Sequence, residues 1–357
     1  MYRQLADLLR EEIRSGGFPD GKIPSERELS RRYKVSGNVA SWAVDLLVKE
    51  GLLYRVHRRG TFVADSILSA GSFARPVVYT TVGPGREQLL DRGGLYARMV
   101  YMLRENAERD GYELVAHPLA EKDSWRFKTL TSSPFFAGAV AFHHAFARDY
   151  LGNIIGKTPI VVVDHCIDLF GDAAPLDHVS YVATDNERAA YEVTRYLISK
   201  GHRKIIFFGG DSVAPVDNYP TYCERVGGYR RAMEEAGLSC APGPYPFDNG
   251  LDETYWKKQA CDGITAAIAY NDYSVMLALN LIHRVGLKVP DDISLVCFDD
   301  LMQQLQDAVP RITAMAMPVR GMVDLAWKLI TESSEHAGST MKRLPYTLSE
   351  RDSVAQL

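Results

Sequence analysis

The spacing of apolar residues changes character near residue 65 of this 357-residue chain. Before that point, apolar residues first recur at helical spacing and then alternate as they do in a strand. Beyond it, short apolar runs are separated by longer stretches of helical spacing, which predicts a larger α/β region. The elements predicted in the first part are helices over 2–15, from Ser25 onward and over 37–50, and a hairpin of 52–56 with 61–63.

Two of the predicted helices carry capping signals. Ser25 and Glu28 form a capping-box pattern, in which each residue satisfies the other's backbone N–H. Ser36 precedes the third helix, and Gly51 ends it. Two capped helices joined by a short turn and followed by a basic hairpin are typical of a winged helix-turn-helix. Residues 1–65 are therefore predicted to place a helix in a DNA major groove.

The layout also identifies the side chains that would contact DNA. Arg27 and Arg31 lie one turn apart on the second helix, where phosphates would pass. The first turn of the third helix would face base edges, and the hairpin tip would contact the backbone or the minor groove. Taken alone, each of these polar or charged surfaces could instead serve only to keep the protein soluble. The candidate DNA-binding residues are Arg27, Arg31, Ser36, Asn38, Ser41, His57, Arg58, Arg59 and Gly60.

The first 65 residues resemble the winged helix of the GntR family. The resemblance is carried by the run KIPSERELS, by the VS pair that opens the third helix and by the closing strand RGTFV. That family usually shows arginine directly after the VS pair and again four residues later, where this chain has Gly37 and Ser41. A bidentate arginine contact discriminates between bases by about 1–3 kcal/mol. The departure predicts an altered operator, weaker binding, or more reliance on Asn38, Ser41 and the hairpin.

The remainder of the chain is predicted to be a linker, 66–75, and a two-lobed body, 76–357. The apolar runs of the body read as buried parallel strands in two successive strand–helix sets. The fold class is therefore α/β, with two doubly wound parallel sheets behind an N-terminal winged helix-turn-helix. The lobes are expected to comprise 76–165 with a returning segment near 301–320, and 166–300 with 321–357.

Polar residues at predicted strand ends provide a candidate site for a small molecule. Ligands of doubly wound sheets bind at the carboxyl ends of the strands, and a hinge between two lobes can close on them. Carboxylates, amides and guanidinium groups suit vicinal hydroxyls. Each strand-end residue could instead only cap a turn or a helix, and the aromatic residues Tyr79, Phe247 and Trp256 could be core rather than sugar-stacking. The candidate effector-binding residues are Asp164, Arg225, Asn271, Asp299 and His143.

The body resembles the effector domain of the LacI/GalR family, which is itself similar to periplasmic sugar-binding proteins. The resemblance is strong over about 179–353 and weak over 76–178. It is carried by TDNERAAYEVTRYLISKGHRKIIFFGG, ERVGGYRRAMEEAG, AIAYNDYSVMLALNLIHRVGLKVPDDISLVCFDD and LPYTLSERDSV. By this similarity Asp164, Arg225, Asn271 and Asp299 fall on positions that touch the effector. The joined head and body resemble AraR-like sugar-responsive repressors.

Charge and cysteine content agree with this division. Residues 1–65 hold 12 Lys and Arg against 9 Asp and Glu, whereas the rest holds 29 against 36. A basic head on an acidic body is expected when only the head meets phosphate. The five cysteines show no C-x-x-C spacing and read as reduced thiols. No apolar run approaches 18 residues and no leader is recognised, so we expect a cytoplasmic protein that does not enter a membrane.

The sequence thus predicts a DNA-binding transcriptional repressor that responds to a small molecule. A monosaccharide is the first choice of effector, and a nucleoside or purine is the second. We expect a homodimer on a roughly palindromic operator. The alternative is a protein that binds or transports a small molecule without regulating DNA, but no export signal is recognised. An enzyme is not expected, because the chain lacks G-x-S-x-G, H-E-x-x-H and P-loop motifs. No cofactor and no metal are predicted.

Overall fold

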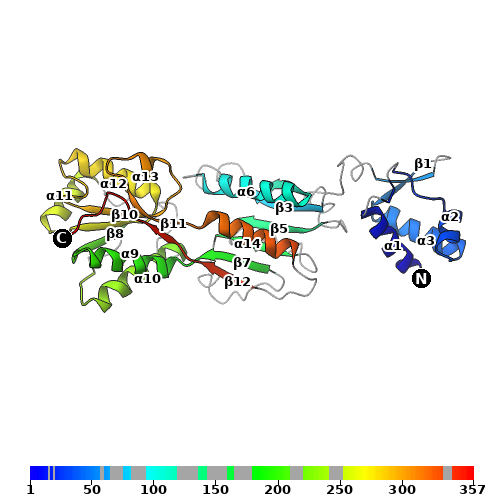
Figure 1. The fold of residues 1–357 in the computed structure, drawn as a ribbon, viewed down its shortest axis with the longest axis horizontal. Helices are drawn as coiled ribbons and strands as arrows, with labels where there is room; N and C mark the ends of the chain where they lie inside the picture. The colour runs from blue at the N-terminus through cyan, green and yellow to red at the C-terminus, as the bar shows by residue number, and fades with distance from the viewer. Residues whose placement is uncertain are drawn as a thin grey trace. The chain divides into compact units, whose positions relative to one another are not determined.

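The computed structural model describes residues 1–14, 17–18, 21–56, 60–64, 75–81, 94–118, 136–142, 159–164, 179–209, 220–240, 252–332 and 340–357. These residues form an N-terminal head and two sheets with their helices (Figure 1). The contacts divide the chain into two compact units. The second unit comprises Thr80–Leu103, Pro118–Ala120 and Ala139–Leu357, and it contains the entire five-stranded sheet.

The head is a winged helix-turn-helix, as the sequence predicts. Helices α1 and α2 both pack against α3, and β1 pairs with β2 in an antiparallel hairpin. Leu9, Leu29 and Leu47 are among the buried residues of its core. Leu8 of α1 is 54% exposed, because Leu5 and Leu9 occupy the buried stripe of its helix. The elements are α1 (Tyr2–Arg14), α2 (Glu26–Arg32), α3 (Gly37–Lys49), β1 (Leu53–Val56) and β2 (Gly60–Val63).

The predicted capping contacts are confirmed. Ser25 Oγ accepts from the N–H of Glu28 at 3.4 Å, and the Ser25 N–H donates to Glu28 Oε2 at 2.7 Å. Ser36 Oγ accepts from the N–H of Val39 at 3.4 Å and so begins α3. Gly51, which follows α3, adopts a φ of +76° that a side chain would oppose. These contacts fix where the second and third helices begin and where the hairpin leaves them.

The first sheet of the body has six strands in the order β12-β7-β6-β5-β3-β4. The pairs β12–β7, β7–β6 and β6–β5 are parallel. Helix α14 packs on β6 and β7. The elements are β3 (Arg75–Thr81), α6 (Leu95–Asp110), β4 (Tyr112–Pro118), β5 (Gly138–Phe142), β6 (Ile160–Val163), β7 (Val179–Thr184), α14 (Val319–Thr331) and β12 (Met341–Leu344).

The second sheet has five strands in the order β13-β11-β10-β9-β8. Strands β8 to β11 run parallel, and β13 is antiparallel to β11 at the edge. The antiparallel edge strand departs from the all-parallel expectation. The elements are α9 (Asn186–Ser199), β8 (Ile205–Phe208), α10 (Pro220–Glu235), α11 (Glu253–Cys261), β9 (Ala266–Ala269), α12 (Asp272–Arg284), β10 (Ser294–Asp299), α13 (Gln304–Asp307), β11 (Thr313–Ala316) and β13 (Thr347–Ser349).

Successive residues of the second sheet serve two cores, which explains its uninterrupted apolar strands. Ile206 and Phe208 join the cluster formed with α11, α12 and α13. Ile205 and Phe207 join the cluster formed with α9 and α10 on the opposite face (Figure 1). Side chains of a strand point alternately to its two faces, so both positions must be apolar when helices cover both. The doubly wound expectation is confirmed for this sheet.

The expected boundaries between the two lobes are wrong, because several strands belong to the other sheet than the one expected. Strand β7, expected to begin the second lobe, pairs with β6 in the first sheet. Strand β11, expected in the returning segment of the first lobe, pairs with β10 in the second sheet. Helix α14 and strand β12 then return to the first sheet. Buried strands of both sheets have the same apolar composition, so local pattern does not reveal which sheet a strand joins.

Helices α9 and α10 approach closely at a glycine. A Cβ placed on Gly228 would lie 2.0 Å from the carbonyl oxygen of Glu187, a backbone atom that cannot swing away. This glycine therefore lets α10 lie against α9 and brings the start of α10 to the strand ends. Among the helices of the described residues, none is long and apolar enough to cross a membrane.

Candidate functional site

The described residues among those proposed to contact DNA lie at least partly exposed on the head. Arg27 and Arg31 on α2 are exposed, as are Ser36, Asn38 and Gly60, and Ser41 is half-buried. Their exposure leaves them available to a duplex. His57, Arg58 and Arg59 lie outside the described residues, so their assignment stays a prediction.

Arg55 is a residue of the head that the sequence did not single out. It extends from β1 and donates to Asp45 of α3 at 2.5 Å and to Glu26 of α2 at 2.8 Å. The guanidinium therefore joins the hairpin to both helices of the helix-turn-helix. All three side chains are partly exposed, so the two ion pairs orient the hairpin relative to the helices more than they stabilise the fold.

In the body, two aspartates occupy equivalent places at strand ends. Asp164 directly follows β6 of the first sheet, and Asp299 ends β10 of the second. Their φ angles are +88° and +87°, in the left-handed region that non-glycine residues seldom adopt. Such backbone strain concentrates at functional sites, where it fixes the direction of a side chain.

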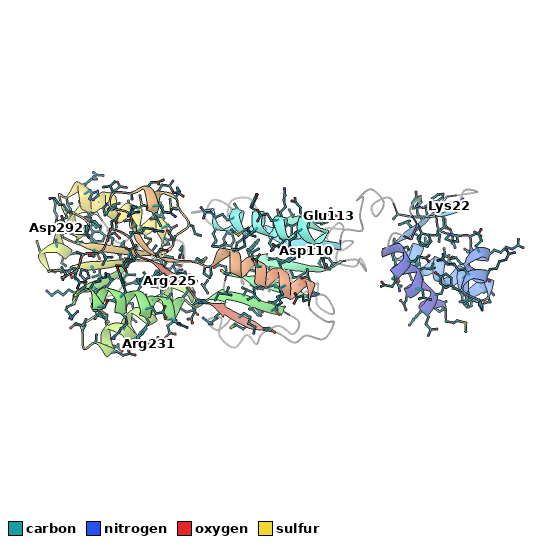
Figure 2. All side chains as sticks on the ribbon, in the orientation of Figure 1. Lys22, Asp110, Glu113, Arg225, Arg231 and Asp292 are labelled. Carbon is teal, nitrogen blue, oxygen red and sulfur yellow. The ribbon has the colours of Figure 1, made fainter. Side chains whose placement is uncertain are left out.

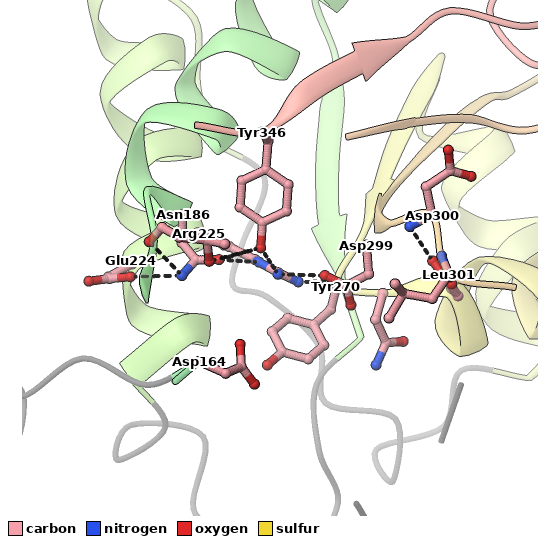
Figure 3. Close-up of polar contacts among 12 residues, drawn as sticks. Asp164, Asn186, Glu224, Arg225, Tyr270, Asp299, Asp300, Leu301 and Tyr346 are labelled. Carbon is pink, nitrogen blue, oxygen red and sulfur yellow. Dashed lines mark hydrogen bonds and ion pairs between the residues drawn. The ribbon is translucent and has the colours of Figure 1, made fainter. Parts of the chain in front are cut away.

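Arg225 of α10 forms the centre of a buried polar network (Figure 3). Its Nη2 donates to Asp299 Oδ1 and to the Tyr346 hydroxyl, each at 2.7 Å. Its Nε donates to Asn186 Oδ1 at 3.0 Å, and its Nη1 donates to the carbonyl oxygen of Tyr270. Four of the five N–H groups of the guanidinium are thus used inside the protein.

Aromatic rings complete the surroundings of this guanidinium. Its central carbon lies 4.2 Å from the ring centroid of Phe298, 4.9 Å from that of Tyr270 and 5.7 Å from that of Tyr346. Burial opposes the charge of Arg225, but Asp299 and the two tyrosines more than offset it and raise the arginine pKa. The Arg225 side chain therefore remains charged, and these contacts fix its position. It can influence a bound molecule through Asp299, whose carboxylate it holds.

The charge of Asp164 acts on Asp299 although the two residues come from different sheets. Burial raises the pKa of Asp299, Arg225 opposes the shift, and the negative charge of Asp164 adds to it. Asp164 Oδ2 accepts from the Tyr96 hydroxyl at 3.1 Å, and the Tyr96 ring lies 5.5 Å from that of Phe142. Figure 3 draws Asp164 and the Tyr270 ring near the Arg225 network. All of these residues belong to the second compact unit.

The side chains of Asn271 and Asp272 accept hydrogen bonds from two different backbone segments. Asn271 Oδ1 caps α12 by accepting from the N–H of Ser274 at 2.9 Å. Asp272 accepts from the N–H groups of Asp300, Leu301 and Met302 at 2.7–2.9 Å. Burial and the charge of Asp299 raise the pKa of Asp272 to about 7, against these three donors. The helix cap, which the sequence left as an alternative for Asn271, is therefore present.

The described chain passes between the two sheets at three segments, and the network touches all of them. The segment from β7 to α9 contributes Asn186, and the segment from β12 to β13 contributes Tyr346, whose hydroxyl donates to Asn186 Oδ1 at 3.0 Å. The segment from β11 to α14 contributes the N–H of Met317, which donates to the Asp299 carbonyl at 3.0 Å. Groups that hold Asp299 therefore also hold the connections between the sheets.

Four of the five candidate effector residues are described, and their roles differ. Asp164 and Asp299 lie at strand ends as expected, whereas Arg225 is nearly inaccessible. His143 lies outside the described residues. Sequence reasoning missed Tyr96 and Asn186, which lie at the starts of helices, and Tyr346, which lies in the connection between β12 and β13. No group of three potential metal ligands occurs in the described parts of the chain.

Comparisons with known proteins identify both parts of the chain. Residues 1–63 match the bacterial regulatory proteins of the gntR family, and residues 194–354 match the periplasmic binding protein-like domain. An arabinose metabolism transcriptional repressor of Geobacillus stearothermophilus is 26% identical, over 84% of this chain and 82% of its own length. A probable opine utilization operon repressor of Rhizobium rhizogenes is 31% identical, over 48% of this chain and 91% of its own.

Solved structures agree on the fold of the body. A LacI family transcriptional regulator from Weissella paramesenteroides with bound glucose aligns with a TM-score of 0.58 at 20% identity. The alignment covers 79% of this chain and 99% of that one. A winged helix joined to such a body defines a DNA-binding regulator with a domain for a small molecule. The chain belongs to the bacterial transcriptional regulators that combine a GntR-type head with a periplasmic-binding-protein-like effector domain.

Proposed function

We propose that this protein is a transcriptional repressor that binds its operator through the head and releases it when a monosaccharide binds beside Asp164 and Asp299. The observation that carries the proposal is the equivalent placement of these two aspartates, which end strands of the two sheets with left-handed φ angles of +88° and +87°, where doubly wound sheets bind their ligands. The charge of Asp164 also raises the pKa of Asp299. Ionised carboxylates accept hydrogen bonds from sugar hydroxyls. A ligand that brings several hydroxyl donors would engage both carboxylates.

The residues around the pair have distinct proposed roles. Asp164 and Asp299 accept from hydroxyls, the Asn271 amide donates to one, and the Tyr96 ring covers an apolar face of the sugar. Arg225 holds Asp299 in place rather than contacting the sugar, because it is buried and four of its five N–H groups are already used. His143 is the fifth proposed contact. The name of the arabinose repressor and the glucose bound to the solved regulator support a monosaccharide as the class of effector.

The proposed oligomeric state is based on how the head would bind its operator. A homodimer presents two winged helices to the two halves of a roughly palindromic operator, inside the cytoplasm. The effector acts by closing the two sheets of the body on itself through the three connecting segments. Closure in each subunit changes the spacing of the two heads and thereby their joint affinity for the operator.

A thermal-shift screen of the full chain against pentoses, hexoses, sugar phosphates and nucleosides tests the effector class. A ligand at one hundred times its dissociation constant adds about 2.7 kcal/mol to the free energy of unfolding of the form that binds it. We expect a pentose or a hexose to raise the melting temperature of the body. Stabilisation by a nucleoside alone, with no response to any sugar, contradicts the proposed effector.

A further inference from the structure

The outward face of α3 has an unusual composition for a helix that enters a major groove. Asn38, Trp42, Asp45 and Lys49 recur at spacings of three or four residues and are exposed, with Ser41 half-buried beside them. These residues occupy the side of the helix opposite its buried residues Ala40, Ala43, Val44 and Leu47. A duplex lying on this face would therefore meet these residues first.

The residues that α3 contributes to this face carry no positive charge before Lys49. Lys49 is the last residue of α3, and the only other charged side chain, Asp45, is held by Arg55. Direct readout of guanine depends mostly on arginine or lysine, which donate to O6 and N7. Base recognition by α3 must then rest on neutral side chains, with the electrostatic attraction supplied by other residues of the head.

Trp42 is the largest of those neutral side chains, and its placement is defined. It is 56% exposed, although its ring packs edge-on against that of Tyr2 at a centroid distance of 6.2 Å and an angle of 79°. The contact with α1 limits the rotation of the indole while leaving more than half of it open. A held and exposed aromatic ring on a recognition face offers apolar contact area rather than hydrogen bonds.

We propose that α3 reads A·T pairs, with Asn38 donating to and accepting from adenine and Trp42 packing on a thymine methyl group. Adenine presents N6 and N7 to an asparagine in the major groove, and thymine alone among the bases presents a methyl group there. The proposal rests on the proposed DNA-binding function and extends it to the class of operator. Affinity for phosphate then comes from residues such as Arg27 and Arg31.

Replacing single thymines by deoxyuridine tests the methyl contact directly. The full chain first selects its operator from a random duplex library, and each thymine of one half-site is then exchanged in turn. We expect one or two exchanges to weaken wild-type binding about fourfold, the effect of one buried methyl-sized group. The Trp42→Ala variant should be insensitive to the same exchanges. Fluorescence anisotropy measures both.

Two further variants separate this contact from nonspecific effects. Leu8→Ala removes another exposed apolar side chain of the head, on α1, and should keep the full deoxyuridine sensitivity. Gly37→Arg adds a guanidinium where a Cβ meets nothing within 4 Å, and selection with this variant should gain a guanine.

Selection of a G·C-rich operator by the wild type, or equal deoxyuridine sensitivity in Trp42→Ala, overturns the readout proposal. In either case the DNA-binding function stands. Failure to select any duplex refutes the DNA-binding function itself, together with the readout. If Trp42→Ala binds DNA normally but no longer forms the oligomer of the wild type, the exposed ring contacts a protein partner. That result also overturns the readout proposal.

Discussion

Arg225→Met should lower the free energy of unfolding of the body by about 3–5 kcal/mol, the range observed when one partner of a buried ion pair is removed. The substitution leaves the Asp299 carboxylate without its guanidinium and removes the donors to Asn186 and to the Tyr270 carbonyl. Urea denaturation of the full chain measures the loss.

Arg231→Met is the matched control. Arg231 lies on the same helix and pairs with Glu187, but both side chains are nearly half exposed. Figure 2 labels both arginines. An exposed pair contributes about 0–1 kcal/mol, so this variant should unfold close to the wild type. Equal losses for Arg225→Met and Arg231→Met would contradict the central place given to Arg225.

The deficit of Arg225→Met should depend on pH. The pKa of Asp299 in the folded protein is raised by burial and by Asp164, and is lowered by Arg225. Without the arginine, the folded-state pKa rises further above its unfolded value. A group shifted upward in this way stabilises the fold only when protonated, so its contribution is lost as the pH rises through the folded pKa. The deficit should therefore be smaller at pH 5 than at pH 8.

Asp164→Asn should weaken effector binding about 10- to 100-fold without loss of the fold. A hydrogen bond to a charged group contributes about 1.5–3 kcal/mol, and each 1.4 kcal/mol corresponds to a factor of ten in affinity. Asparagine keeps an oxygen for the Tyr96 hydroxyl but removes the charge offered to the sugar. Isothermal titration calorimetry with the sugar identified by thermal shift measures the change.

Asp291→Asn is a suitable comparison, since Asp291 is an exposed aspartate of the same body. It should bind the sugar as the wild type does. If Asp164→Asn also binds normally, the carboxylate pair is not the effector site, even where the protein still responds to a sugar. Unchanged operator binding by both variants, in the absence of sugar, shows that the head is intact.

Local interactions explain what the sequence predicted well. The Ser25–Glu28 box and the Ser36 cap each join residues three apart, so their chemistry is visible in a short window. Asp164 and Asp299 were found because parallel strands bring their carboxyl ends to one edge, wherever the strands lie in the chain. In both cases a general rule of helix capping or sheet topology was sufficient, and the tertiary fold did not have to be known.

Distant interactions explain what the sequence did not reveal. The hydroxyl of Tyr346 donates to Asn186 across 160 residues, and Tyr96 donates to Asp164 across 68. Nothing near either tyrosine distinguishes it from a core aromatic residue. Arg225 was predicted to be an effector contact, but only the structure reveals that four of its five N–H groups are already engaged. The assignment of β7, β11 and β12 to sheets failed for the same reason, because strand pairing is a nonlocal property.

The central claim is that the sugar and the operator compete through one polypeptide. Fluorescence anisotropy of the full chain on its selected operator, with and without saturating sugar, tests this claim most directly. We predict that the sugar raises the operator dissociation constant about 5- to 150-fold, and that the operator weakens sugar binding by the same factor. A sugar that stabilises the body against heat but leaves the operator dissociation constant unchanged would contradict it.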